Sequence, residues 1–207
     1  MEFSTKTKQE YLNIIADQVA NWNRADVRTV PGVMIQVCVG QNKHDNTIEH
    51  QINYFMDCAE TYVHNHRHAF STYGLQGEYK EKIWEIVDDK NGDIVYKFPR
   101  LTGNVFDSPI VVPGTLRHVK SRHHFPGNEM HVPTHQFHSI VPTPNSSDRV
   151  LTFLTKAHTV SSDMFVLSTS AEIEARKDAI RPATEEERQS VLEKLEQVLA
   201  APHRYGF

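Results

Sequence analysis

Hydrophobic and polar positions change their period twice along the chain, from helical spacing to strand alternation and back. Residues 7–23 predict an amphipathic helix that begins at a capping box formed by Thr7 and Glu10. After Pro182, a second box formed by Thr184 and Glu187 predicts a C-terminal helix. In both segments apolar residues recur at the spacing of one helix face: Tyr11, Ile15, Val19 and Trp22 in the first, and Val191, Leu195, Val198 and Leu199 in the second.

Between the helices, short runs of strand-type residues are separated by turn signals. The runs fall at 33–39, 48–56, 60–66, 69–79, 82–87, 94–98, 109–112, 115–120, 129–132, 137–141, 150–156 and 164–168. Pro31-Gly32 marks the first break, 88–93 a hairpin connection with Asn91-Gly92, and 142–148 a surface loop. Many short strands that do not alternate with helices favour a sandwich or barrel over a parallel sheet.

Length and charge limit the classes of protein that fit. We expect a single domain over 1–207, with a helical extension at 1–30, a β-barrel at 31–170 and a C-terminal helix at 171–207. The 22 basic and 26 acidic residues leave a net charge of −4, which provides no field to attract nucleic acid or an anionic membrane. No apolar run reaches the roughly 18 residues of a membrane span.

The two cysteines and the polar first residues predict a cytoplasmic protein. Met1–Glu10 lacks the apolar core of a signal peptide. Cys38 and Cys58 are too few for a disulfide framework, which fits a reducing compartment. Both are more simply explained as small core residues than as nucleophiles, since no basic neighbour or helix terminus is evident.

Histidine is the unusual component, with thirteen in the chain and nine of them between His64 and His138. Imidazole is the commonest metal ligand in proteins. On a strand, His64 and His66 would point to the same side with Cα atoms about 6.6 Å apart, so they could offer two nitrogens to one ion. An isolated pair of this kind is more simply explained as a surface or core pair without a metal. The residues around the pair therefore decide whether it is interpreted as a metal site.

That context resembles the cupin family, whose members are small β-barrels of the jelly-roll type. The first cupin motif is a glycine, five residues, His-x-His, three or four residues, a glutamate, six residues and a glycine. Here His64-x-His66 is followed at that spacing by Phe70 and Gly77, and Cys58 replaces the opening glycine. A hydrocarbon therefore stands where the family has its carboxylate ligand.

The second cupin motif matches a segment far downstream. Its pattern is a glycine, five residues, a proline, x, a glycine, two residues, a histidine, three residues and an asparagine. This chain keeps that spacing at Gly127, Pro133 and His138, whereas His135 and Pro142 replace the inner glycine and the asparagine.

Together the motifs imply a mainly β, cupin-type jelly-roll barrel with flanking N-terminal and C-terminal helices, and a metal ion bound by His64, His66 and His138. Three neutral imidazoles leave a divalent ion its full charge and open positions for O2 and an anionic or thiolate substrate. The thiol dioxygenases, a branch of the cupins, have this kind of site, in which three histidines hold Fe(II). The stretch Leu75–Glu81 also resembles a segment of cysteine dioxygenase, although the Ser-x-His-x-Tyr arrangement of that enzyme is not evident.

A different register is open for the third ligand. His118 also follows a proline, Pro113, by five residues, but Asp107 stands where the motif glycine would fall. We therefore favour His138. His68 is also within reach of the cluster, although its use would upset the motif spacing.

The leading hypothesis is an Fe(II)-dependent dioxygenase that acts with O2 on a small polar molecule, such as a thiol or a carboxylate. Zn, Mn, Ni and Cu are alternatives, because intrinsic affinity does not favour iron. With zinc or manganese the same site would suit a hydrolase, isomerase or lyase, and the fold also serves non-catalytic binding proteins. The expected partners are a small-molecule substrate and O2, with no nucleic acid and no membrane, and a homodimer is a family-level expectation.

Further site residues follow from strand parity and charge. Tyr62 should share the face of His64 and could donate a hydrogen bond to a group bound at the metal, or simply pack in the core. Gln36 or Gln51 could line the pocket from neighbouring strands. A basic cluster, formed by Arg117, Arg122, His123 and His124, could hold a substrate carboxylate or phosphate, or form a solvated face or dimer rim.

Overall fold

The computed structural model describes residues 6–41, 48–56, 60–88, 92–99, 107–142, 149–161, 163–173, 180–205 and 207. Its helices are α1 (Lys8–Ala20), α2 (Glu185–Ala200) and the short turns η1 (Trp22–Arg24) and η2 (Pro202–Arg204). Its strands are β1 (Asp26–Val30), β2 (Met34–Gln41), β3 (Ile48–Phe55), β4 (Val63–His64), β5 (His68–Gln76), β6 (Tyr79–Val87), β7 (Ile94–Pro99), β8 (Ile110–Pro113), β9 (Thr115–His124), β10 (Glu129–Val132), β11 (Phe137–Pro142), β12 (Leu151–Val160), β13 (Phe165–Ser168) and β14 (Arg181–Pro182).

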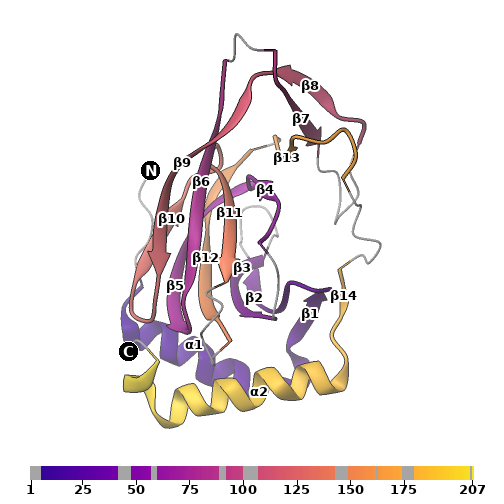
Figure 1. Ribbon diagram of the computed structural model, residues 1–207. Helices are drawn as coiled ribbons and strands as arrows, with labels where there is room; N and C mark the ends of the chain where they lie inside the picture. The colour runs from indigo at the N-terminus through magenta and orange to yellow at the C-terminus, as the bar shows by residue number, and fades with distance from the viewer. Residues whose placement is uncertain are drawn as a thin grey trace.

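The strands form two antiparallel sheets (Figure 1). Sheet A has the order β10-β5-β12-β3-β2-β1-β14, and sheet B has the order β8-β7-β13-β4-β11-β6-β9. The pairs β3–β12, β4–β11, β5–β10 and β6–β9 are nested in sequence, and they lie alternately in sheet A and sheet B. A long antiparallel ribbon that is rolled up in this way is a jelly roll. The expected mainly β jelly-roll barrel with flanking helices is confirmed.

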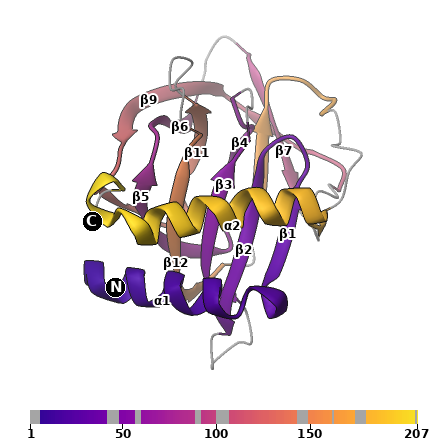
Figure 2. The same ribbon diagram turned by 90° about the horizontal axis from the view of Figure 1, so that it is seen from below.

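Both helices cover the outer face of sheet A (Figure 2). The two predicted capping boxes are present, at Thr7 and Glu10 and at Thr184 and Glu187. The core beneath the helices joins their buried stripes to outward-facing strand residues, among them Tyr11, Ile15, Ile35, Val37, Ile52, Tyr73, Phe153, Val191 and Leu195. Because strand side chains alternate, the next residue on each strand faces the interior between the two sheets.

Several helix and strand boundaries in the structure differ from the predicted ones. Asp26–Val30, which we assigned to the helical extension, forms β1 of sheet A, and β14 pairs with it. The turn between the predicted strands 69–79 and 82–87 lies at Gly77, whose φ of 68° is one that glycine adopts readily. In the run 60–66, only Val63 and His64 form a strand. The predicted turn positions 89–91, the loop positions 143–148 and Cys58 lie outside the described residues.

Within the described part of the chain, no helix is both long and apolar enough to span a membrane.

Candidate metal centre and the cavity beside it

Three histidines converge on the inner side of sheet B. His64 on β4 and His138 on β11 are direct register partners, and His66 follows β4 by two residues. One ring nitrogen from each histidine lies within 4.8 Å of those of the other two, and Nε2 of His66 is 2.8 Å from Nε2 of His138. The structure thus brings together the three residues that the motif spacing selected, from two segments more than seventy residues apart in sequence.

The segment that carries His64 and His66 is anchored by the residue between them. The buried Asn65 donates hydrogen bonds from its amide nitrogen to the carbonyl oxygens of Thr134 (3.1 Å) and Asp163 (2.8 Å). Its amide oxygen accepts a hydrogen bond from the backbone N–H of Phe165 (2.6 Å). Asn65 therefore anchors the backbone that carries His64 and His66, although β4 itself is only two residues long.

The spacing of the imidazoles suits a single metal ion. Two nitrogens that lie about 2.1 Å from one ion are about 3.0 Å apart when they are at right angles and about 4.2 Å apart on opposite sides. The 2.8 Å between His66 and His138 is close to the first value. The 4.8 Å limit for the whole cluster is slightly above the second, so small rotations would bring all three rings around one ion.

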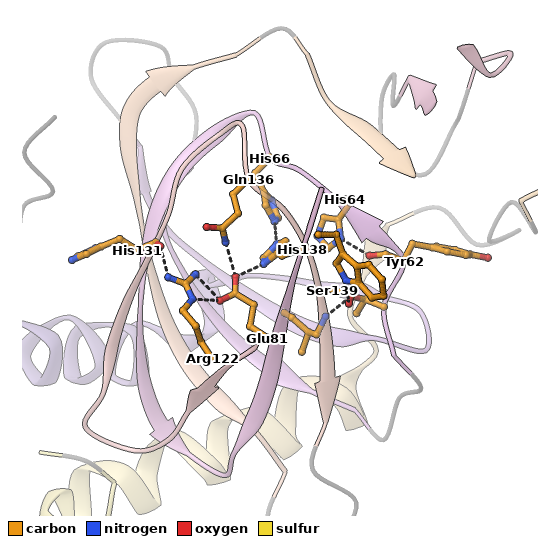
Figure 3. A network of polar contacts seen from close by, with 12 residues as sticks. Tyr62, His64, His66, Glu81, Arg122, His131, Gln136, His138 and Ser139 are labelled. Atoms are coloured by element: carbon orange, nitrogen blue, oxygen red, sulfur yellow. Dashed lines mark hydrogen bonds and ion pairs between the residues drawn. The ribbon is translucent and has the colours of Figure 1, made fainter. Parts of the chain in front are cut away.

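A buried carboxylate contacts the far side of this cluster (Figure 3). Glu81 on β6 accepts a hydrogen bond from Nδ1 of His138 at 2.6 Å and another from Nε2 of Gln136 at 3.0 Å, both on its Oε1. Its Oε2 accepts from Nε of Arg122 at 2.7 Å. Burial alone would raise the pKa of Glu81, but the hydrogen bond from His138 and the charge of Arg122 outweigh it and hold the pKa below its ordinary value. Glu81 is therefore ionised.

Two hydrogen-bond acceptors, the carbonyl oxygen of Tyr62 and the carboxylate of Glu81, fix the tautomers of His64 and His138. Nδ1 of His64 lies 2.7 Å from the carbonyl oxygen of Tyr62, and an oxygen of this kind can only accept. Nδ1 of His138 likewise faces the ionised Glu81. Both rings therefore carry their proton on Nδ1 and keep the lone pair of Nε2, which is the arrangement that metal-binding histidines need. In the contact between His66 and His138, His66 is then the donor, and it would have to carry its proton on Nδ1 instead to bind a metal through Nε2 as a neutral imidazole.

Phe70, which stands at the carboxylate position of the first histidine motif in sequence, packs against the histidine cluster in the structure. Its ring is buried and packs edge-on against His66, with the ring centroids 4.8 Å apart. The ring of His138 lies 6.4 Å away. One side of the histidine cluster is thus closed by a hydrocarbon, which cannot coordinate a metal.

A cavity of about 480 Å³ between the sheets adjoins the histidines, a volume typical of small-molecule sites. The three histidines and Glu81 lie on its sheet B wall. The sheet A wall carries uncharged polar side chains: Gln36, Gln51, Asn53, Thr72 and Thr152. Gln36 donates to Oδ1 of Asn53 at 3.2 Å. Gln36 and Gln51 therefore line a pocket, as expected, and their contact with a substrate stays a prediction.

The predicted basic cluster does not act as a unit. Arg117, Arg122 and His124 are absent from the cavity wall. Arg117 pairs with Glu85 on the surface, and Arg122 pairs with Glu81 behind the histidines. His124 is buried against Tyr79, with ring centroids 4.6 Å apart, and burial lowers its pKa to about 4. The structure therefore places these three residues outside the described lining of this cavity, and their role in substrate binding stays a prediction.

The other predicted site residues, Tyr62, His118 and His68, also lie outside the three-histidine cluster. Tyr62 lines the cavity, but its ring points away from the imidazoles (Figure 3), because β4 begins only at Val63 and strand parity does not reach Tyr62. His118, the alternative third ligand, lies 3.1 Å from Ser121 of its own strand and outside the cluster. His68 lines the cavity without belonging to the cluster.

Sequence reasoning missed Glu81 and Asn65. Glu81 has a recognisable signal, since Tyr79, Glu81 and Ile83 share one strand face and a charge flanked by apolar residues on that face should be buried. Asn65 has none, because the central position of His-x-His is open to any residue.

The sequence matches no protein-family model and no curated protein. Among solved structures, it resembles hydroxypropylphosphonic acid epoxidase from S. wedmorenis, with 13% identity over 65% of this chain and 56% of that one, and a TM-score of 0.41. An RmlC-like cupin from Shewanella frigidimarina is 19% identical over 66% and 87% of the chains, with a TM-score of 0.36. The CENP-C cupin domain of Drosophila melanogaster is 8% identical over 74% and 100%, with a TM-score of 0.41.

The chain thus spans little more than half of the epoxidase. Similarities at this level do not bear on ligand or reaction, and the fold assignment rests on the nested strand pairing.

Proposed function

We propose that this protein is a metal-dependent enzyme that holds Fe(II) with His64, His66 and His138 and oxygenates a small polar molecule in the adjoining cavity. The observation that carries the proposal is the convergence of three imidazoles, two of them with fixed tautomers, on a cavity whose opposite wall carries uncharged polar side chains. Fe(II) bound by three neutral imidazoles would keep its double positive charge and open positions suited to O2 and an anionic substrate group.

The cavity wall favours a substrate with a negative charge. Lys156 and Arg67 are its basic residues among the described lining, apart from histidines, and Glu81 is its acidic one. The charge of Glu81 is already balanced by Arg122, at 2.6 Å. A carboxylate or thiolate would therefore meet a net positive wall, while its uncharged polar groups face Gln36, Asn53 and Thr152.

Residues of the chain would also keep the site ordered and partly dry. The carbonyl of Tyr62 and the carboxylate of Glu81 hold the Nδ1 protons of His64 and His138, so neither ring can rotate without losing a hydrogen bond. Phe70 and Val132 supply apolar surface on the wall beside them. A partly dehydrated site strengthens the electrostatic contacts of a bound anion.

Oxygen consumption tests this function. The protein is purified without chelator, stripped, and reloaded anaerobically with Fe(II) or Zn(II), and O2 uptake is followed with thiols, amino acids and phenolic acids. We expect uptake with the Fe(II) protein on an anionic member of the panel, none with the Zn(II) protein, and none with His138→Ala. Stoichiometric metal without uptake on any compound would contradict the oxygenase and favour a hydrolase, isomerase or lyase at the same site.

A further inference from the structure

We infer that Glu81 is a positioning residue of the metal centre, which acts by holding His138 in the orientation and tautomer that present Nε2 to the metal. This inference rests on the proposed metal site. It is carried by the 2.6 Å contact between Oε1 of Glu81 and Nδ1 of His138, and by the near-complete burial of both side chains. Carboxylates that contact the far nitrogen of a ligating histidine orient the ring and make it a stronger donor.

The position of the carboxylate is fixed from several strands at once. Glu81 comes from β6, His138 from β11 and Arg122 from β9, and Nη1 of Arg122 also donates to the carbonyl oxygen of His131 on β10 at 3.2 Å. Gln136, just before β11, adds the bond at 3.0 Å. Figure 3 shows these side chains meeting at Glu81 on the side of His138 away from His66. Rotation of the carboxylate would break several hydrogen bonds together.

Only a carboxylate satisfies all of these neighbours. Arg122, Gln136 and Nδ1 of His138 are all donors toward residue 81, and an ionised carboxylate is a group that only accepts. A glutamine of the same shape would turn its NH2 group toward Arg122 or toward His138. In the second case His138 would have to accept at Nδ1 and carry its proton on Nε2, where it could no longer bind a metal.

The carboxylate of Glu81 thus contacts a metal ligand and not the metal position itself. Phe70 excludes a carboxylate from the metal side of the cluster, whereas Glu81 contacts the opposite edge of His138. The chain therefore combines three neutral ligands with a charged group behind one of them. We expect this arrangement to strengthen metal binding while the coordination positions on the cavity side stay open.

Metal affinity tests the inference, with a matched control on the same strand. Competition titrations with Zn²⁺, and visible spectra with Co²⁺, are compared for wild type, Glu81→Gln and Glu85→Gln. Glu85 also lies on β6 and pairs with an arginine of β9, but on the surface. We expect Glu81→Gln to weaken Zn²⁺ binding roughly 10- to 100-fold and to alter the Co²⁺ spectrum. Glu85→Gln should match wild type in both measurements.

A double-mutant comparison separates positioning from general stability. Gln136→Met removes a neutral partner of Glu81 but keeps both Arg122 and the carboxylate against His138, so it should reduce metal affinity far less than Glu81→Gln does. In a His138→Ala background, Glu81→Gln should change the residual affinity by less than about twofold. Equal losses of affinity in Gln136→Met and Glu81→Gln would overturn the inference, because they would point to a purely structural role.

The metal-binding results also distinguish a failure of the role of Glu81 from a failure of the proposed metal site. If wild type binds no metal, the proposed site and this inference both fail. If wild type binds metal and folded Glu81→Gln binds it as tightly, the inference alone fails. Should Glu81→Gln not fold, NMR of ¹⁵N-histidine in wild type decides: we expect the His138 signal, assigned by its loss in His138→Ala, to show the proton on Nδ1, and a proton on Nε2 would contradict the inference.

Discussion

Two glutamate–arginine pairs cross the same two strands of this protein and have opposite surroundings. Glu81 pairs with Arg122, and Glu85 pairs with Arg117, each at matched register between β6 and β9. The side chain of Glu81 is 1% exposed and that of Arg122 is 29% exposed, against 43% and 62% for Glu85 and Arg117. The ladder shifts register at Ile83/Trp84, between the two pairs.

This difference shows that position, rather than residue type, decides what an ion pair does. A surface pair is solvated whether or not it forms, so it contributes little. A buried carboxylate must be satisfied on all sides, and Glu81 is satisfied by Arg122, Gln136 and His138 together. The buried pair therefore links the barrel wall to the histidine cluster, and the surface pair links only two strands.

The largest effect is expected from Arg122→Met. It leaves the Glu81 charge buried without its cation, which typically costs about 3–5 kcal/mol of unfolding free energy. Urea unfolding at neutral pH measures this loss. A loss below about 1 kcal/mol would mean that the inner pair is as weakly coupled as a surface pair.

The same division between buried and exposed applies to the neighbouring histidines of β9. Burial lowers the pKa of His124 to about 4, whereas the unfolded chain would protonate this residue near 6.5. The unfolded state therefore binds the proton first, and stability should fall as pH drops from about 6.5 to about 4, by up to about 3 kcal/mol.

His124→Gln should flatten part of this dependence, while the exposed His123→Gln should leave it unchanged. His50, whose pKa burial also lowers to about 4, should account for much of the remaining slope. Thermal unfolding between pH 4 and 7 measures the pH dependence of stability for wild type, His124→Gln and His123→Gln. An unchanged slope in His124→Gln would contradict a neutral, buried His124.

A third carboxylate, Glu187, is intermediate in burial and should be intermediate in effect. It forms a bidentate pair with Arg181, at 2.8 Å for both contacts, and accepts from Thr29. The hydrogen bonds from Arg181 are the main reason that its pKa is lowered to about 2. We expect Glu187→Gln to cost on the order of 1–2 kcal/mol at neutral pH.

The pH dependence of this pair has a definite sign. The stability that Glu187 provides is fully present above about 4.5, the ordinary value, and is lost as pH falls toward about 2. Unfolding curves of wild type and Glu187→Gln should therefore converge in this range. Curves that stay parallel down to pH 2 would show that the carboxylate charge contributes nothing.

The smallest effect is expected from Glu85→Gln. The exposed pair with Arg117 should be worth less than about 1 kcal/mol, and 1 M salt should remove most of that. Urea unfolding at low and high salt measures both values. A loss similar to that of Arg122→Met would erase the contrast between the two pairs.

Much of the fold could be predicted because its determinants are local. The capping boxes locate the helices, and strand residues between turn signals locate most strands. The pairing of β4 with β11 is not local, and the spacing of the two histidine motifs indicated it only through the cupin resemblance.

What could not be predicted depends on which way single side chains face. Arg117, Arg122, His123 and His124 are close in sequence, yet the strand alternates and crosses a register shift, so they have separate surroundings. The ring of Tyr62 does not share the face of His64, because β4 is too short to impose parity. Glu81 was recognisable as a buried charge, but its partner His138 comes from a strand 57 positions away.

Metal content is the most direct test of the central claim. Wild type, His138→Ala and His118→Ala are purified without chelator, loaded with Fe(II) anaerobically, desalted and analysed for metal per chain. We predict about one ion in wild type and in His118→Ala, because His118 lies outside the cluster, and none in His138→Ala. Retention of the ion by His138→Ala, or its loss from His118→Ala, would contradict the site proposed for this protein.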